Sequence, residues 1–128
     1  MSKEENIERL YQILRFDDNW NGYGAKPIPL DVIHKTKILI NSFIIQPSIY
    51  PTGNESIQLE WENDDYYFEV NIHSNIDKLD YLLEDKTKDT ILNNSSDTDD
   101  IYLNNDPNDI NRYLIKYFKD EGVNNSYA

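Results

Sequence analysis

Residues 57–62 and 66–72 alternate apolar and polar side chains with a period of two, and a short polar stretch containing Asp64 and Asp65 separates them. Successive side chains of a strand point to opposite faces, so each stretch predicts a strand with one apolar face. The short connection predicts an antiparallel hairpin with Asp64 and Asp65 as its loop. A slip of one residue would set apolar side chains against polar ones, so the pattern selects one register. Its expected pairs are Trp61 with Phe68, Leu59 with Val70 and Ile57 with Ile72.

Two helices are expected before this hairpin. Ser2 and Glu5 have the spacing of a capping box and precede apolar residues with a helical period, which predicts a helix over residues 3–16. A second helix is expected over residues 30–46, where apolar residues again recur with a period near 3.6, and Pro47 is expected to end it. This second helix is apolar beyond a single stripe, so we expect it to be covered on more than one side or to form a dimer face.

The chain after the hairpin is more polar. Residues 78–83 predict a third strand that continues the apolar face, although their leucines also fit a short helix. The residues at 85–105 are rich in Asp, Asn, Ser and Thr, which predicts a mobile acidic loop or a pair of short edge strands. Asp106 and Pro107 provide an N-cap and a proline at the first helical position, and the helix they begin is expected to end near Gly122.

The expected order of elements is two helices, three strands, a loop and a helix. This order is typical of an α+β fold in which helices pack on one face of a small antiparallel sheet. A chain of 128 residues has about the length of one domain, so we expect a single domain over residues 1–121 and a frayed tail over residues 122–128.

Acidic residues are concentrated in the middle of the chain. The sequence has 24 Asp and Glu against 12 Lys and Arg, a net charge of -12. Residues 55–109 contain 16 acids and three bases, or -13, so the remainder totals +1. Because nucleic-acid affinity depends on Lys and Arg neutralising phosphates, this balance excludes DNA or RNA binding by the bulk surface. It favours either a positively charged protein partner or a simple solvated surface.

The chain contains no cysteine, which excludes disulfides, thiolate zinc sites and thiol nucleophiles. Its two histidines have no metal-ligand spacing, so we expect neither a metal nor a cofactor. It also has no basic N-terminal region followed by an apolar run, and no apolar run of about 18 residues. We therefore expect a cytoplasmic protein without a membrane partner.

The hairpin register places Glu60 opposite Glu69, with Glu62 on the same face. Facing carboxylates occur in acid–base pairs and cation sites, so together with His73 they could form a carboxylate-based metal-dependent hydrolase. The other interpretation is an exposed polar face, screened by a nearby lysine or by water. We favour the exposed face, because no recognisable catalytic arrangement accompanies the carboxylates.

Residues 20–28 read Trp-Asn-Gly-Tyr-Gly-Ala-Lys-Pro-Ile. Two aromatic residues among glycines could form a stacking surface for a base or a sugar. We favour a structural role, in which the glycines have positive φ and the aromatic rings fold back over the core. The residues assigned to this structural loop are Trp20, Gly22, Tyr23 and Gly24.

This loop, the later Pro-Thr-Gly of residues 51–53, and the Ile-Gln-Leu-Glu-Trp of residues 57–61 together resemble a group of small uncharacterised bacterial and mobile-element proteins. Those proteins resemble one another in a Trp-Asp/Asn-Gly/Ser-Tyr-Gly-Ala loop, a later Pro-Thr, and a Gly-x-Ile/Val-x-Leu-Glu-Trp strand. The resemblance covers residues 7–72 and implies an accessory gene of the kind found near toxin–antitoxin or phage-defence loci. Where the group has a glycine before the strand, this chain has Glu55, which predicts an opened turn.

These features predict an acidic protein-binding inhibitor of the antitoxin, immunity or phage anti-defence type. It would mask the basic nucleic-acid-binding surface of a nuclease or effector, since complementary charge speeds association. The alternatives are the carboxylate-based hydrolase and a structural or oligomerisation module. The candidate partner contacts are Glu60, Glu62, Asp64, Asp65 and Glu69 on the hairpin and Asp97, Asp99 and Asp100 on the acidic loop.

Overall fold

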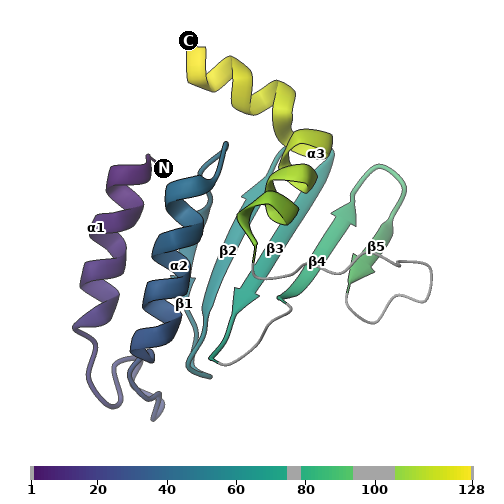
Figure 1. Cartoon of the computed structure of the whole chain (residues 1–128). Coiled ribbons are helices and arrows are strands. Elements are labelled where there is room, and N and C mark those ends of the chain that lie inside the picture. The colour runs from purple at the N-terminus through teal and green to yellow at the C-terminus, as the bar shows by residue number, and fades with distance from the viewer. Residues whose placement is uncertain (1, 75–78, 94–105, 128) are drawn as a thin grey trace.

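The computed structural model describes residues 2–74, 79–93 and 106–127 of the chain, with the side chains of residue 93 and of residues 119–127 left out (Figure 1). It has two helices, a five-stranded antiparallel sheet and a C-terminal helix, which confirms the expected α+β class. No described helix is long and apolar enough to cross a membrane. The elements are α1 (Lys3–Leu14), α2 (Leu30–Ser42), β1 (Ser48–Pro51), β2 (Ile57–Glu62), β3 (Tyr66–Ile72), β4 (Asp80–Asp85), β5 (Thr90–Asn93) and α3 (Pro107–Tyr127).

The strands lie in the order β1-β2-β3-β4-β5, so each pairs with its neighbours in the sequence (Figure 1). The expected hairpin register is confirmed, because Trp61 pairs with Phe68, Leu59 with Val70 and Ile57 with Ile72.

The connection between β2 and β3 depends on Asn63. Its side-chain Oδ1 accepts hydrogen bonds from the backbone N–H of Asp65 at 2.9 Å and of Tyr66 at 2.7 Å. The backbone N–H of Asn63 also donates to the carbonyl of Tyr66 at 3.0 Å. Neither Asp64 nor Asp65 has a positive φ, so the two-residue loop is not the type I′ turn that tight hairpins favour. The Asn63 side chain stabilises it instead.

Residues 80–85 form a strand, β4, so the short helix that their leucines also allowed is wrong. Tyr81 pairs with Val70 and Leu83 with Phe68, as expected for a continued apolar face. Tyr81 and Leu83 are buried, and so is Leu79, which precedes the strand. A short leucine-rich segment is compatible with the period of a strand and with that of a helix. Pairing with β3 therefore decided that this segment is a strand.

Both edge strands lie outside the stretches that have a clear strand pattern in the sequence. β1 lies in the stretch between Pro47 and Glu55, and Ile49 is its one buried residue, too weak a pattern to indicate a strand. β5 lies within the residues expected to be a mobile acidic loop, at 85–105, and agrees with the alternative of a short edge strand there. The remainder of that stretch, including the candidate contacts Asp97, Asp99 and Asp100, lies outside the described residues.

The capping box of α1 is confirmed, because Ser2 and Glu5 exchange side-chain and backbone hydrogen bonds. The expected end of the second helix is wrong, because α2 ends at Ser42 and Phe43 is already extended. Asn111 of α3 explains this early end: its Nδ2 donates to the Ser42 carbonyl at 2.9 Å and its Oδ1 accepts from the Ile44 N–H at 3.1 Å. A side chain distant in sequence thus satisfies backbone groups at the helix end.

α3 begins as expected, with Asp106 accepting the backbone N–H of Asn108 at 2.9 Å. It continues to Tyr127, past the expected end near Gly122, and includes most of the 122–128 stretch expected to be frayed. A single glycine in a helix costs about 1 kcal/mol relative to alanine, which is not enough to end the helix by itself.

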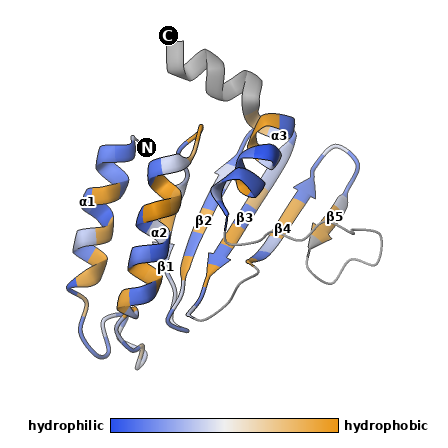
Figure 2. Ribbon diagram, viewed as in Figure 1, coloured by the Kyte–Doolittle hydropathy of each residue, from blue (hydrophilic) through white to orange (hydrophobic). Residues whose placement is uncertain are grey.

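The core joins the helices to one set of alternating strand residues. Trp61 and Phe68 stack on each other, with ring centroids 5.3 Å apart. Phe43, just after α2, packs edge-on against Trp61 at 5.3 Å, and Tyr113 of α3 stacks on Phe68 at 5.4 Å. Figure 2 shows hydrophobic and hydrophilic residues alternating along β2 and β3. These rings form a continuous aromatic row from the end of α2 to α3.

Candidate functional site

The strand residues that do not enter the core lie on the opposite side of the sheet, and most are half-buried or exposed. Five of them carry carboxylates, and no strand residue on this side is Lys or Arg. We call this surface the acidic face. Its described side chains on β2 to β5 are Gln58, Glu60, Glu62, Tyr67, Glu69, Asn71, Asp80, Leu82, Glu84 and Ile91.

The register arranges these side chains in rows across the strands. The expected pairing of Glu60 with Glu69 is confirmed, and Glu69 in turn pairs with Leu82. Cβ atoms of directly opposed residues lie about 4.5–5.5 Å apart, so the two carboxylates are near neighbours. A second row places Tyr67 between two further carboxylates, those of Glu62 and Glu84.

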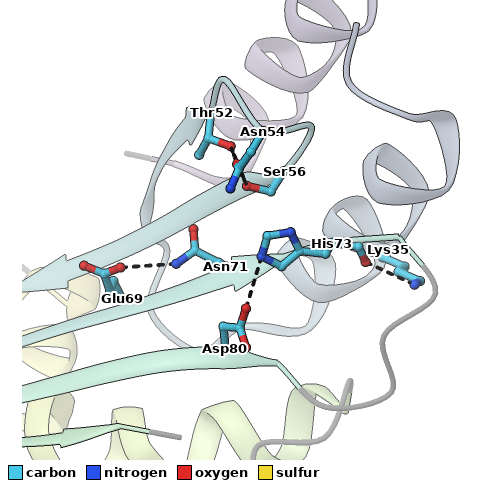
Figure 3. A network of polar contacts seen from close by, with 8 residues as sticks. All are labelled: Lys35, Thr52, Asn54, Ser56, Glu69, Asn71, His73 and Asp80. Carbon is cyan, nitrogen blue, oxygen red and sulfur yellow. Dashed lines mark hydrogen bonds and ion pairs between the residues drawn. The ribbon is translucent and has the colours of Figure 1, made fainter. Parts of the chain in front are cut away.

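Neutral donors hold the facing carboxylates, and Figure 3 shows one of these contacts, from Asn71 to Glu69. Gln58 Nε2 donates to Glu60 Oε2 at 2.6 Å. Glu69 accepts from the Tyr67 hydroxyl at 3.0 Å and from Asn71 Nδ2 at 3.2 Å. Hydrogen bonds from amides and a phenol fix the carboxylates in place without neutralising them, so the negative charge of the face is retained.

The phenol of Tyr67 is adapted to this position. Burial raises its pKa above the usual value of 10.0, and the neighbouring carboxylates of Glu69 and Glu60 raise it further. The hydroxyl therefore stays protonated at physiological pH and remains a donor to Glu69.

Lys86 screens the edge of the acidic face, at Glu62. Lys86 Nζ lies 2.7 Å from Glu62 Oε2 and also donates to the Asn63 carbonyl at 2.7 Å. The described hydrogen bonds of Glu60 and Glu69 come from neutral side chains, and Lys86 pairs with Glu62 and not with them. Lys78, the other nearby lysine expected to screen this pair, lies outside the described residues. Among the described residues, Lys86 is the one lysine or arginine in an ion pair with the acidic face.

His73 lies at one end of the face, where β3 stops (Figure 3). Its Nε2 is 3.2 Å from Asp80 Oδ2, and its backbone carbonyl accepts from Lys35 Nζ at 3.4 Å. The imidazole is therefore engaged with Asp80, away from the Glu60–Glu69 pair that it would have to join in the hydrolase hypothesis. The described residues contain no group of three or more His, Cys, Asp or Glu that could hold a metal ion.

The remaining hairpin candidates lie at the end of the face. Asp64 and Asp65 are exposed in the turn between β2 and β3, and the Asp65 carbonyl accepts the Lys86 N–H at 2.8 Å. Two further carboxylates of the face, Asp80 and Glu84, were not among the predicted contacts. The alternation of apolar and polar residues at 79–84 would have assigned Asp80 and Glu84 to the acidic face. It could be used only once that segment was known to be a strand.

The aromatic loop divides into a packed part and an exposed part. Gly22 and Gly24 have positive φ, as expected. The Trp20 ring stacks on Phe16 with centroids 5.1 Å apart, and its Nε1 donates to the Lys26 carbonyl at 2.8 Å. Trp20 is thus folded back against the core, as its structural role requires.

Tyr23 contradicts the expectation that both aromatic rings fold back, because its side chain is 92% exposed. Two asparagine side chains fix the backbone there: Asn21 Oδ1 accepts the Tyr23 N–H at 2.8 Å, and Asn19 Oδ1 accepts the Gly24 N–H at 2.7 Å. With the adjacent backbone held in this way, the Tyr23 ring points into solvent.

The turn before β2 is closed, which corrects the expectation that Glu55 opens it. The Thr52 N–H donates to the Ser56 carbonyl at 3.0 Å, and the side chains of Thr52, Asn54 and Ser56 hydrogen-bond to one another (Figure 3). Glu55 has a φ of 64°, in the left-handed region that favours glycine. A glycine at this position would therefore fit the same turn without steric strain.

The second helix packs against α1 and against the sheet strands β2 and β3, and its remaining side is exposed. Leu39 is buried, whereas the neighbouring Ile38 is 62% exposed. The expected coverage on more than one side is therefore confirmed, and a dimer face on α2 stays a prediction.

No protein-family model matches this chain, and neither a curated protein nor a solved structure matches it significantly. The resemblance to small bacterial and mobile-element proteins therefore stays a prediction based on the motifs of residues 20–28 and 51–61.

Proposed function

We propose that this chain is an acidic protein-binding inhibitor that covers the basic nucleic-acid-binding surface of a nuclease or effector. The observation that carries the proposal is the acidic face, in which five carboxylates project from three adjacent strands with no Lys or Arg among them. A surface of this kind attracts a positively charged protein and repels nucleic acid.

The rigidity of the face supports the proposal. Glu60 and Glu69 lie on paired strands in the centre of the sheet and are held by Gln58, Tyr67 and Asn71. A binding surface that is ordered before association loses less conformational entropy when the partner binds. Because the ordering bonds come from neutral groups, the carboxylates remain available to Arg and Lys of a partner.

Charge complementarity also supports the proposed class of inhibitor, one that blocks a nucleic-acid-binding cleft. A cleft that binds phosphates presents Lys and Arg, and a row of fixed carboxylates can occupy those groups in place of a nucleic-acid backbone. An inhibitor of this kind suits the antitoxin, immunity or phage anti-defence role implied by the motif resemblance, acting in the cytoplasm.

The test compares two variants that remove the same number of charges. Glu60→Gln, Glu62→Gln, Glu69→Gln and Glu84→Gln together neutralise four carboxylates of the face. The control combines Glu4→Gln, Glu8→Gln, Asp17→Asn and Asp18→Asn, four exposed acids on α1 and the loop after it. Asp80 is left unchanged because it pairs with His73.

Each immobilised protein is used to capture partners from a host lysate at about 0.1 M and about 0.5 M salt, which changes the screening of surface charge. A captured protein is then purified, bound to labelled duplex DNA or RNA, and titrated with each variant. We expect the wild type and the control to displace the nucleic acid, and the face variant to need about a hundredfold higher concentration. Equal loss in both variants, or a captured partner that binds no nucleic acid, contradicts the proposal.

A further inference from the structure

The two edge strands of the sheet are built differently. β1 is preceded by Pro47 and ends in Pro51, and Asn6 of α1 donates to the Pro47 carbonyl at 2.9 Å. Prolines and a covering helix are devices that prevent an edge strand from pairing with another chain. β5 reads Thr-Ile-Leu-Asn, with neither proline nor charge. Within the part of the chain that the structure describes, β5 pairs only with β4 and its outer edge is open.

β5 is held firmly enough to act as a template. The turn before it is fixed by Asp85, whose Oδ1 accepts the backbone N–H of Thr87 at 3.0 Å and of Lys88 at 3.2 Å. Leu92 is half-buried and packs against the core. Ile91 is 54% exposed and lies on the acidic face, directly opposite Glu84.

We propose that the outer edge of β5 receives a β-strand from the basic partner, with Lys or Arg at alternate positions on the side of the acidic face. This inference rests on the proposed function and names how the partner is held. In such strand addition, backbone hydrogen bonds provide affinity and alternate side chains provide specificity. A six-stranded sheet then extends the acidic face with a basic row.

The spacing of the sheet fits this arrangement. Neighbouring strands lie about 4.8 Å apart, so an added strand lies about 9.6 Å from β4. The aliphatic part of a Lys or Arg side chain can lie over Ile91, while its charged end reaches the carboxylate of Glu84. Charge complementarity also selects this occupant over a second copy of the chain. Pairing two β5 edges would place two faces of like charge side by side, each on a chain of net charge -12.

The probe is a synthetic peptide of about eight residues, the length of an ordinary strand, that alternates lysine and valine. Amide hydrogen exchange is measured on the full chain with and without the peptide. We expect the outward-facing backbone amides of β5 to become protected, whereas those of β1 do not change. The same peptide methylated on its backbone nitrogens keeps its charge but cannot form strand hydrogen bonds, and it should bind about tenfold more weakly.

Thr90→Pro and Ile91→Pro show which backbone N–H groups of β5 donate hydrogen bonds to the peptide. Successive residues of a strand direct their N–H groups to opposite edges, so one of these prolines removes a bond to β4 and the other removes an outward donor. The variant that keeps the wild-type unfolding midpoint identifies the outward donor, and it should lose the peptide-induced protection.

The outcomes separate this inference from the proposed function. If both peptides bind equally and the four-glutamine variant binds neither, strand addition is overturned and the charge-based proposal stands. If the four-glutamine variant still shows protection of β5, strand addition stands without the acidic face. Protection of the outward-facing β5 amides in the isolated chain overturns the inference, whereas the amides that bond to β4 are protected in any case. Outward protection that grows with protein concentration assigns the edge to a second copy, and outward protection independent of concentration assigns it to the chain itself.

Discussion

The two faces of β2 and β3 consist of alternating residues of the same strands but have opposite chemistry. On one face Trp61 and Phe68 stack within a buried aromatic row. On the other face the adjacent residues Glu60 and Glu69 are directly opposed and held by neutral donors. The difference teaches that the buried face fixes the register, because a one-residue slip would bury the carboxylates. Packing of the buried face therefore positions the acidic face, whose own side chains contribute little to that packing.

The largest expected effect comes from the buried face. Phe68→Ala removes a fully buried ring that contacts Trp61 and Tyr113, and we expect the free energy of unfolding to fall by about 3–5 kcal/mol. Glu69→Ala, one residue away on the acidic face, should change it by less than about 1 kcal/mol. Urea denaturation of both variants measures the contrast. Equal losses would mean that the acidic face is part of the core after all.

A smaller and opposite effect is expected at Glu55, in the turn that precedes β2. Its φ of 64° is strained for a residue with a side chain, and Glu55→Gly relieves that strain. We expect a gain of about 0.5–1 kcal/mol in the free energy of unfolding. Glu55→Ala keeps the strain and serves as the matched control. A loss of stability in the glycine variant would show that the turn depends on the Glu55 side chain.

Tyr67 allows the acidic face to be tested through pH. Its pKa is raised in the folded chain by burial and by Glu69, so the folded state holds the phenol proton more tightly than the unfolded state does. This stabilisation is complete below the unfolded pKa near 10 and is lost as the pH rises through the folded value. Thermal unfolding from pH 8 to about 11 should therefore show a steeper loss in the wild type than in Tyr67→Phe. Parallel curves would contradict the coupling between Tyr67 and the carboxylates.

The smallest effect is expected from Glu60→Gln combined with Glu69→Gln. The substitutions remove two facing charges but keep the shape of the side chains, so the free energy of unfolding should stay within about 0.5 kcal/mol of the wild type. Partner binding in the displacement assay should nevertheless fall. A large loss of stability would assign the pair a structural role, and the acidic face would then stabilise the fold as the buried face does.

Much of the central fold was predictable because its residues interact with near neighbours in the sequence. The capping box of Ser2 and Glu5 depends on residues three positions apart. The register of the β2–β3 hairpin depends on two adjacent alternating stretches, and Glu60 facing Glu69 followed from it directly. Asp80 and Glu84 could not be assigned to the same face, because residues 78–83, expected to form a strand, also fitted a short helix until their partners on β3 were known.

Other features depend on contacts that residue type and periodicity do not specify. α2 ends at Ser42 because the side chain of Asn111, on α3, satisfies the backbone there. Tyr23 is exposed because Asn19 and Asn21 shape the loop around it, a geometry that residue type alone does not specify. β5 is a strand because it pairs with β4, although the polar stretch of residues 85–105 that contains it also fitted a mobile loop.

The sequence by itself determined the net charge of -12, its concentration in residues 55–109, and the alternation that places Glu60 and Glu69 on one side of a hairpin. Only the tertiary structure decided that β4 joins this hairpin, that its carboxylates enlarge the acidic face, and that β5 provides an edge beside it. The physical reason is that local periodicity reports which side of a strand is apolar. Which strands share that side is set by cross-strand pairing and by a core built from the whole chain.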